Sequence, residues 1–366
     1  MNGVDGATPK HPVGIDQRTA PLSLAPFGEA VRGCAQDAMR AARDVPSFGT
    51  NLAATIAWAV QTAVDVPPPG MGQTAETWEL LASIAMLDVS AARILEPHLD
   101  ALSILAEAQR EGRDADLDSL GVTAASSWGV YAAEGARVNA THSPDGWRLT
   151  GTKNWCSLAG QLSHALVTAW TGPDTRRLFA VALRDPRVVA HDGPWVSRGL
   201  PHVVSASVDF SNAPAVPIGE DGWYLTRPGF AWGGMGVAAV WWGAAVPLVH
   251  AIAERASTDR ADQLALMYAG AADSALWATR SVLAEGAAAI DAPIVGRDLK
   301  ITAERVRSIT ATRVEEILSL ADRALGPGPL TSNEAHARRV ADLRIYLRQH
   351  HGERDLARLG TLVTSS

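Results

Sequence analysis

One segment, Gly146–Gly160, carries residues suited to binding a flat ring, and it reads Gly-Trp-Arg-Leu-Thr-Gly-Thr-Lys-Asn-Trp-Cys-Ser-Leu-Ala-Gly. Its spacing predicts a short amphipathic strand, a tight turn at Thr150-Gly151 and a second strand. The second strand places Trp155 beside small polar residues, among them Ser157. An indole offers a flat apolar surface, and a neighbouring hydroxyl or backbone N–H offers a hydrogen-bond donor. The segment therefore predicts a stacking wall with a donor beside it.

Two adjacent histidines, His350 and His351, stand near the C-terminus in the segment Asp342–Gly352. An imidazole has an ordinary pKa of about 6.5, so it can act as a base at neutral pH without the burial that a glutamate needs. Adjacent side chains on a helix point about 100° apart, so only one of the two can face a given site. The alternative is that both belong to a solvated helix end.

The apolar pattern changes along the chain. Residues 22–112 are rich in Ala and Leu, and Thr77–Gln109 has the spacing of a helix, which Pro97 is expected to end or kink near Glu96. Residues 120–222 have short β-prone runs separated by turns instead. These runs predict strands at 137–140, 147–150, 165–170, 178–183 and 207–210.

The helical pattern returns at Phe230 and continues to about Leu359, with breaks expected near 258–260, 291–293 and 326–329. We therefore predict an α+β fold in three parts. These are an N-terminal helical domain (1–115), a middle antiparallel β-domain (116–222) and a C-terminal helical domain (223–366). The crevice where the parts meet is the expected ligand site.

Composition restricts the classes of function. The 366 residues have a net charge of −7 and no basic block, which argues against nucleic acid as a partner. Cys34 and Cys156 are the only cysteines, too few for a disulfide framework, as expected in a reducing cytoplasm. Met1–Pro21 lacks the apolar core of a signal peptide. Phe230–Ile252 is the most apolar run, but its glycines and Pro247 favour a buried helix over membrane insertion.

Several segments resemble the acyl-CoA dehydrogenase family. Gly146–Gly160 resembles the family's Gly-aromatic-x-Leu-x-Gly-x-Lys-x-Trp-x-Ser/Thr signature, and Trp195–Gly219 resembles a later family run that ends in Val-Pro. Trp78–Arg93 is similar to an N-terminal helical stretch. The turn Ala324–Gly328 resembles the glycine turn that receives the cofactor from a neighbouring subunit. The resemblance spans about 75–360 and implies the family's fold and a homodimer or homotetramer built through the C-terminal helices.

The resemblance also implies FAD as cofactor. A flavin ring needs a stacking surface, a few donors and exclusion of water. Trp155 is the implied surface and Ser157 the implied donor, with core packing and a plain strand hydroxyl as the alternatives. Trp128 and Gly129 are candidate contacts by position in the preceding loop, with packing as their alternative. Gly326 and Gly328 belong to the glycine turn that is expected to meet the cofactor of a neighbouring subunit.

Four family features are missing from the sequence. The family's usual glutamate base lies in a C-terminal segment where this chain has His350 or, with a gap of one residue, His351. Some members place the base at the start of the helix after the β-domain, but Phe230–Gly236 has no carboxylate. Gly234 stands where that segment usually has an arginine. The Arg-x-x-Phe-Gly motif that holds the adenosine end of the cofactor is also absent.

Two other carboxylates are candidates for a chemical role. Glu134 lies in the loop ahead of the ring-binding segment and is the nearby carboxylate most worth testing. Glu96-Pro97-His98 contains a carboxylate and an imidazole, but a surface or interface pair is the stronger interpretation.

Three functions fit these observations. The first is an FAD-dependent oxidoreductase acting on CH–CH bonds of an acyl or acyl-like substrate, either a thioester or a free small molecule. The second is a flavin-dependent monooxygenase on the same fold, because that branch carries a histidine a few turns after an Asp-x-Arg, as in Asp342-Leu343-Arg344…His350. The third is a non-catalytic partner subunit that has lost the cofactor. An electron-transfer flavoprotein suits the first function and a flavin reductase the second.

Overall fold

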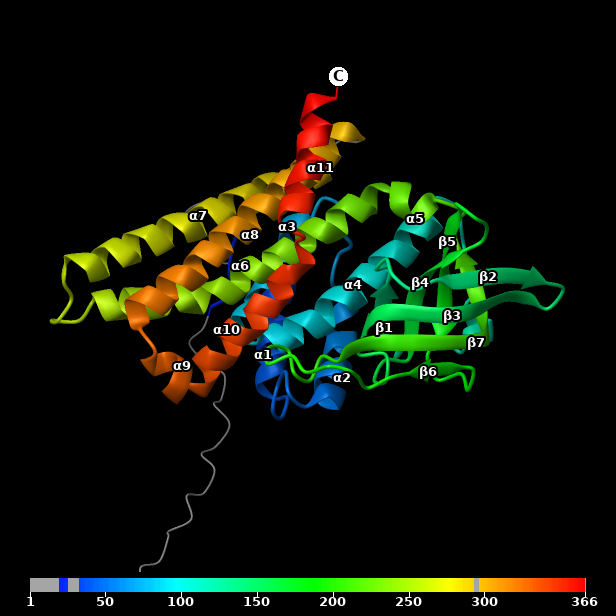
Figure 1. The fold of residues 1–366 in the computed structure, drawn as a ribbon, viewed down its shortest axis with the longest axis horizontal. Coiled ribbons are helices and arrows are strands. Elements are labelled where there is room, and N and C mark those ends of the chain that lie inside the picture. The colour runs from blue at the N-terminus through cyan, green and yellow to red at the C-terminus, as the bar shows by residue number, and fades with distance from the viewer. Residues whose placement is uncertain (1–19, 26–32, 293–295, 366) are drawn as a thin grey trace, which may run out of the picture.

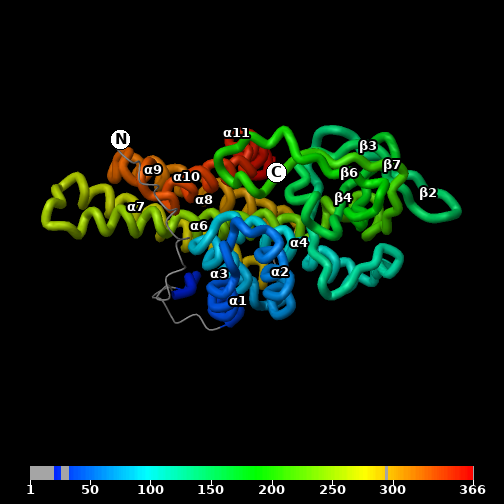
Figure 2. The backbone as a smooth tube through the Cα atoms, turned by 90° about the horizontal axis from the view of Figure 1, so that it is seen from below, coloured from blue at the N-terminus to red at the C-terminus, as the bar shows by residue number. Residues whose placement is uncertain are grey.

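The computed structural model describes residues 20–25, 33–292 and 296–365, so the expectation about a signal peptide at residues 1–19 lies outside the described residues. The chain begins with helices, continues into a β-domain and ends in long helices (Figure 1). Figure 2 shows the N-terminal helices along one side of the long C-terminal helices, with the β-domain at one end of the molecule. The N-terminal helices are α1 (Cys34–Arg43), α2 (Leu52–Ala63), α3 (Thr74–Leu87) and α4 (Val89–Arg110).

A short 3-10 turn, η1 (Asp118–Leu120), leads into the β-domain. Its strands are β1 (Trp128–Tyr131), β2 (Val138–Ser143), β3 (Gly146–Ser157), β4 (His164–Trp170), β5 (Arg176–Ala182), β6 (Val188–Ala190) and β7 (Ser205–Ile218). The order is β1-β4-β2-β3-β7-β5, and β5 also pairs with β4, so the sheet closes on itself. The five predicted strands correspond to β2, β3, β4, β5 and β7, whereas β1 and β6 were not predicted. The pairing is not wholly antiparallel as expected, because β1 and β2 each pair parallel with β4.

The ring-binding segment forms one long strand, so the predicted turn at Thr150-Gly151 is wrong. β3 pairs with β7, and the register shifts twice, as in β-bulges, between Leu149 and Thr150 and between Lys153 and Cys156. Gly151 has φ 123°, and a Cβ there would lie 2.3 Å from the Arg137 carbonyl oxygen. The glycine is thus required by a close approach of backbone inside a strand.

The C-terminal part is helical, as predicted. Its elements are α5 (Trp223–Thr226), α6 (Pro228–Ala256), α7 (Gln263–Asp291), α8 (Arg297–Leu325), α9 (Gly328–Ser332), α10 (Glu334–Tyr346), η2 (Leu347–Gln349) and α11 (Glu353–Thr364). The helix breaks fall where they were expected, although Pro293 lies outside the described residues. By length and composition α6 alone among the described helices is apolar enough to cross a membrane, and 83% of its most apolar window is buried inside the protein.

The helix predicted over Thr77–Gln109 breaks at Asp88, not at Pro97. Asp88 has an extended backbone, and its carboxylate accepts a hydrogen bond from the Ala91 N–H, which caps the start of α4. Pro97 lies inside α4, where the helix continues through it. The chain therefore breaks at the capped Asp88, whereas α4 accommodates Pro97 without ending. The break sets the direction in which α4 leaves α3.

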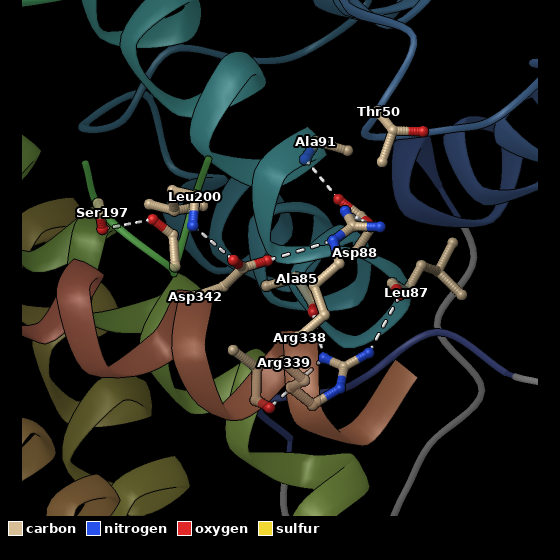
Figure 3. Close-up of polar contacts among 12 residues, drawn as sticks. Thr50, Ala85, Leu87, Asp88, Ala91, Ser197, Leu200, Arg338, Arg339 and Asp342 are labelled. Atoms are coloured by element: carbon tan, nitrogen blue, oxygen red, sulfur yellow. Dashed lines mark hydrogen bonds and ion pairs between the residues drawn. The ribbon is translucent and has the colours of Figure 1, made fainter. Parts of the chain in front are cut away.

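α10 clasps this break (Figure 3). Arg338 pairs with Asp88, and the buried guanidinium of Arg339 donates to the last carbonyl oxygens of α3. Its distances are 2.9 Å to Ala85, 2.8 Å to Met86 and 3.1 Å to Leu87. The end of a helix leaves carbonyl groups without partners and carries partial negative charge, so a cation there is favourable. The clasp fixes α3, α4 and α10 relative to one another.

A close crossing of α3 and α6 completes this helical frame. Gly243 on α6 meets Ala82 on α3, and a Cβ at 243 would lie 2.0 Å from the Ala82 carbonyl oxygen. Because the obstacle is backbone, the two helices have to move apart to accept any side chain.

We predict that Gly243→Ala lowers the free energy of unfolding by about 2–3 kcal/mol. Gly270→Ala is the matched control, because Gly270 lies in α7 with no atom within 4 Å of its would-be Cβ. That change should be neutral or stabilising by up to about 1 kcal/mol, since alanine is the better helix former. Urea unfolding of both variants measures the difference, and equal stability would contradict the described crossing.

Candidate functional site

Trp155 has the features of a binding surface. Its side chain is 63% exposed although it stands in a strand, between Asn154 and the buried Cys156. Its backbone has φ 62°, a left-handed conformation that bulky residues rarely adopt. Such a conformation costs free energy, so it persists only where the surrounding structure stabilises it, and it is frequent at functional sites. The indole ring is thereby presented to solvent instead of packing in the sheet.

Ser157 is the point at which three parts of the chain meet. Its hydroxyl accepts a 3.0 Å hydrogen bond from Nη2 of Arg93 on α4, and it lies 2.7 Å from the hydroxyl of Ser205 on β7. The Tyr131 hydroxyl donates to the Ser157 carbonyl oxygen at 3.0 Å. This short polar chain joins the end of β3 to the first turns of α4.

α10 holds the loop that precedes β7. The Asp342 carboxylate accepts a 2.5 Å hydrogen bond from the Leu200 N–H (Figure 3). A Cβ at Gly199 would lie 2.0 Å from the Ala341 carbonyl oxygen, so the glycine permits this approach. The same loop leads into Ser205. The helix that clasps the α3–α4 break thus also positions the hydroxyl next to Ser157.

Arg93 and Glu96 extend the cluster along α4. Glu96 Oε2 lies 3.4 Å from Nη1 of Arg93 and accepts a 3.0 Å hydrogen bond from the Tyr346 hydroxyl on α10. The Glu96 side chain is only 11% exposed. Burial raises the pKa of Glu96, while the charges of Arg93 and Arg307 and the Tyr346 hydrogen bond oppose that rise. The predicted surface location of Glu96 is therefore wrong.

Arg307 brings a cation to the start of α6 from another helix. Its Nη1 donates to the Gly234 carbonyl oxygen at 2.6 Å, its Nη2 donates to the Gln349 carbonyl oxygen at 3.0 Å, and its guanidinium lies 5.2 Å from the centre of the Trp241 ring. A Cβ at Gly234 would lie 3.3 Å from Cδ of Arg307. Arg307 of α8 thus places a guanidinium against the backbone of Gly234.

A narrow cavity opens beside Glu96, with a volume of about 40 Å³, and it is partly open to solvent. Its walls come from α3, α4 and the start of α6, and they include Trp78, Leu81, Glu96, Leu99, Asp100, Glu107, Trp232 and Gly233. Two indole rings and two leucines make it partly apolar, and its charged lining combines three carboxylates with the guanidiniums of Arg110 and Arg227. It is the concave site expected where the helical lobes meet.

The carboxylates of the cavity differ in their partners. Glu107 accepts a 2.6 Å hydrogen bond from Nη1 of Arg227 and a 3.0 Å bond from the Gly229 N–H at the start of α6. Asp100 has only a 3.9 Å contact with Arg227. Burial raises the pKa of Asp100, and the charge of Arg227 opposes that rise. Gly233 leaves room for this carboxylate, because a Cβ there would lie 2.9 Å from it.

The other candidate site residues have different surroundings. Trp128 is buried, and its ring packs 4.9 Å from His164 in a separate apolar cluster. A Cβ at Gly129 would lie 2.9 Å from the Tyr131 ring, so this glycine is explained by packing. Glu134 is exposed and pairs with Arg176. Gly326 and Gly328 lie at the α8–α9 turn, at the opposite end of the helices from the β-domain (Figure 1).

The two histidines lie in the connection between η2 and α11, so their predicted place on a helix is wrong. His350 is buried, and its Nδ1 accepts from the Gly352 N–H at 3.3 Å while Nε2 lies 3.2 Å from the Ser308 hydroxyl. Nε2 is therefore the protonated nitrogen of the neutral ring. Burial lowers the pKa of His350. His351 is exposed beside Asp355, and neither histidine lines the cavity beside Glu96.

Sequence reasoning missed Arg93 and Arg307, and it set Glu96 aside as part of a surface or interface pair. Arg93 gave a weak signal, as a charged residue among the apolar positions at the start of α4. Arg307 gave no signal, because only the packing of α8 against α6 brings it to Gly234. Among the described residues no group of three or more His, Cys, Asp or Glu side chains has the geometry to hold a metal ion.

Comparisons with known proteins show the fold. No protein-family model matches the sequence, and no curated protein matches it. Three solved structures share the architecture. They are FMN-bound TdsC, a dibenzothiophene monooxygenase from Paenibacillus sp. A11-2 (TM-score 0.71, 17% identity, 90% of this chain and 95% of that chain), a nitrososynthase from Micromonospora carbonacea var. africana (0.73, 17%, 95% and 98%), and butyryl-CoA dehydrogenase from Megasphaera elsdenii (0.72, 15%, 92% and 99%). The chain has the acyl-CoA dehydrogenase-like fold that was expected.

The Asp342 carboxyl gives a pH test of the α10 contacts. Burial raises its pKa from 3.8 to about 6, so the folded protein binds this proton more tightly than the unfolded chain does. The protonated carboxyl therefore stabilises the folded protein, and this stabilisation is lost as the pH rises from about 4 to about 6. We predict that wild type loses about 2 kcal/mol relative to Asp342→Asn between pH 4 and pH 7.

Asp185→Asn is the control of opposite sign. A hydrogen bond from Arg187 lowers the pKa of Asp185, so wild type should gain stability relative to this variant as the pH rises through the ordinary range of an aspartate. Denaturant unfolding at several pH values measures both. A stability difference for Asp342→Asn that is independent of pH would contradict the description of the α10 contact.

Proposed function

We propose that this chain is a flavin-dependent oxidoreductase that acts on a small molecule. The observation that carries the proposal is Trp155, a 63% exposed indole held in a left-handed backbone beside Ser157. A flavin ring needs a flat stacking surface and a few hydrogen-bond partners at its polar edge. A second reactant would approach through the partly open cavity beside Glu96. Proteins with the same fold include an FMN-bound monooxygenase and a butyryl-CoA dehydrogenase, which supports a flavin reaction for this chain.

The residues fit a flavin at the ring end. Trp155 would support the ring, and Ser157 with the Arg93 guanidinium would meet its polar edge. When bound, the flavin supplies the chemistry of accepting or donating two electrons. We propose FAD as the cofactor, with Gly326 and Gly328 of a partner copy meeting its far end in a homodimer or homotetramer. FMN would need the ring site alone.

The cavity favours oxygenation of a polar small molecule over dehydrogenation of an acyl chain. A fatty chain in this cavity would lie against Asp100, which has only a 3.9 Å contact with Arg227, and would offer that carboxylate no hydrogen bond. A substrate with its own polar groups avoids that cost. In this reading Trp78 and Trp232 pack against the substrate and exclude water, and Glu96 holds or accepts a proton beside it.

Dehydrogenation at a CH–CH bond remains the second candidate, because one observation favours it. Such a reaction needs a base that faces the substrate, and Glu96 is a buried carboxylate on the cavity wall. The substrate would be an acyl thioester or an acyl-like small molecule. An electron-transfer flavoprotein would then be the partner, whereas oxygenation calls for a flavin reductase. We expect either reaction to take place in the cytoplasm.

We predict that Trp155→Ala weakens flavin binding roughly 5- to 100-fold, because a stacked aromatic ring contributes about 1–3 kcal/mol. Trp277→Ala is the matched control, since Trp277 is also 63% exposed but lies on α7. Titration with FAD and with FMN, followed by flavin fluorescence, measures the dissociation constants. Equal effects of the two substitutions would remove the assignment of the ring site. Failure to bind flavin in any form would leave the non-catalytic partner subunit.

The two reactions are separated by adding butyryl-CoA to the oxidised flavin complex without oxygen. For an oxygenase we expect the flavin to stay yellow, because no group oriented toward a thioester removes its α-proton. Glu96→Gln serves as the paired variant. Bleaching that the variant abolishes would overturn oxygenation and establish the second candidate.

A further inference from the structure

Asp100 differs from the other carboxylates of the cavity because it lacks a hydrogen-bonded partner. Its side chain lines the cavity and is 22% exposed, and its one ion pair is the 3.9 Å contact between Oδ1 and Nη2 of Arg227. Within the described part of the chain no group donates a hydrogen bond to it. Burying a carboxylate without partners is costly, so Asp100 keeps acceptor sites that a ligand can use.

Arg227 is held in place by other contacts. Its Nη1 donates to Glu107 at 2.6 Å, its guanidinium lies 5.2 Å from the centre of the Tyr224 ring, and its side chain is only 2% exposed. Its Nε is buried without a hydrogen-bond partner among the described residues. Turning the guanidinium toward Asp100 would break the short bond to Glu107 and leave that carboxylate buried and unpaired.

The charges nearest Asp100 leave one negative charge in surplus. The single guanidinium of Arg227 serves two carboxylates, Asp100 and Glu107. Burial raises the pKa of Asp100, the charge of Arg227 opposes that rise, and the charge of Glu107 adds to it. Arg110 also lines the cavity, but it is exposed and lies about 15 Å further along α4, where water screens its charge.

The remaining groups around Asp100 bring no further cation to it. Glu96, one turn earlier on α4, has its own cation, Arg93, at 3.4 Å. The Tyr224 hydroxyl on α5 stays neutral, because burial holds its pKa well above the ordinary value. On α6 Asp100 faces Gly233, whose missing side chain leaves room for the carboxylate. A positive charge is therefore what this part of the cavity lacks.

The position of Asp100 along α4 separates it from the ring site. Arg93, which donates to Ser157, lies seven residues earlier, or about 10 Å along the helix axis. A group bound to Asp100 is thus held away from the ring contact. It serves to recognise the substrate and is not the atom that reacts.

The cavity also restricts the size of that group. A water molecule needs about 10–15 Å³ of such volume, so the 40 Å³ present here hold an end group of about three heavy atoms. Two indole rings, of Trp78 and Trp232, belong to the same walls. Indole rings attract cations and pack against the methylene groups that carry them.

We propose that Asp100 selects substrates with a primary ammonium group at the end remote from the reacting atom. The inference rests on the proposed function, because it takes the cavity beside Glu96 as the substrate site. An ammonium group supplies both the missing positive charge and N–H donors, which form charge-assisted hydrogen bonds with a carboxylate. The substrate class is therefore a small primary amine whose nitrogen is bound but not oxidised.

The test compares three probes with the same six-carbon chain, namely hexylamine, 1-hexanol and hexyltrimethylammonium. Calorimetric titration of the oxidised FMN complex at about pH 8 measures their dissociation constants, and the alkylamine is protonated at that pH. Hexanol has a donor but no charge, whereas the trimethylammonium group has a charge but no N–H donor and is larger. We expect hexylamine to bind roughly tenfold or more tightly than either.

Asp100→Asn keeps the shape of the side chain and removes its charge. It should weaken hexylamine binding roughly 10- to 100-fold and leave hexanol binding nearly unchanged. Asp273→Asn is the matched control, because Asp273 is an exposed carboxylate on α7 and its loss changes the net charge by the same amount. Circular dichroism of both variants checks the fold.

A preference for hexylamine that Asp100→Asn abolishes and Asp273→Asn retains establishes the proposal. Equal binding of hexylamine and either other probe by the wild type overturns it, as does an equal loss of hexylamine and hexanol affinity in Asp100→Asn. The wild-type comparison decides the matter if Asp100→Asn does not fold.

A separate flavin titration distinguishes this inference from the proposed function. Flavin binding without a preference for hexylamine contradicts the inference alone. Absence of flavin binding in every redox state removes the proposed function, and titration of the flavin-free protein with the three probes then decides whether Asp100 binds an ammonium group.

Discussion

The structure depends on the clasp of α10 over the break between α3 and α4. Arg339 donates to the last carbonyl oxygens of α3, and Arg338 pairs with Asp88, which caps the first turn of α4. Both arginines come from a helix about 250 residues further along the chain. Buried cations at a helix end are stable only when their hydrogen bonds are made, so the clasp holds these three helices in one arrangement. One turn later α4 carries Arg93 and Glu96, and two turns later α10 carries Tyr346.

The chemistry of the site is assembled from elements that are distant in sequence. β3 provides Trp155 and Ser157, α4 provides Arg93 and Glu96, α10 provides Tyr346, and α8 provides Arg307. A guanidinium reaches the backbone of Gly234 from α8, and a carboxylate reaches the cavity from α4. The packing of helices that are distant in sequence therefore sets the charges around this part of the protein.

Much of the fold was predictable because it follows from local periodicity. The strands of the β-domain and the breaks between the long helices were found from alternation and from Gly and Pro, and the resemblance in Gly146–Gly160 led to the correct architecture. The errors lie where tertiary contacts override local tendency. Pro97 is accommodated within α4, Gly151 serves a close backbone contact, and the histidines stand in a connection between helices. The burial of Glu96 has the same origin, since its contacts include Tyr346 of α10, which is distant in sequence.

The account rests on the claim that a flavin ring lies against Trp155 and Ser157. A crystal structure of the protein grown with FAD or FMN in the reduced state is the most direct measurement. The account predicts electron density for the ring over the Trp155 indole, with its polar edge at Ser157 and Arg93 and the cavity beside Glu96 open on its other side. Density for the ring at any other place, or a Trp155 indole left uncovered in crystals saturated with flavin, would contradict it.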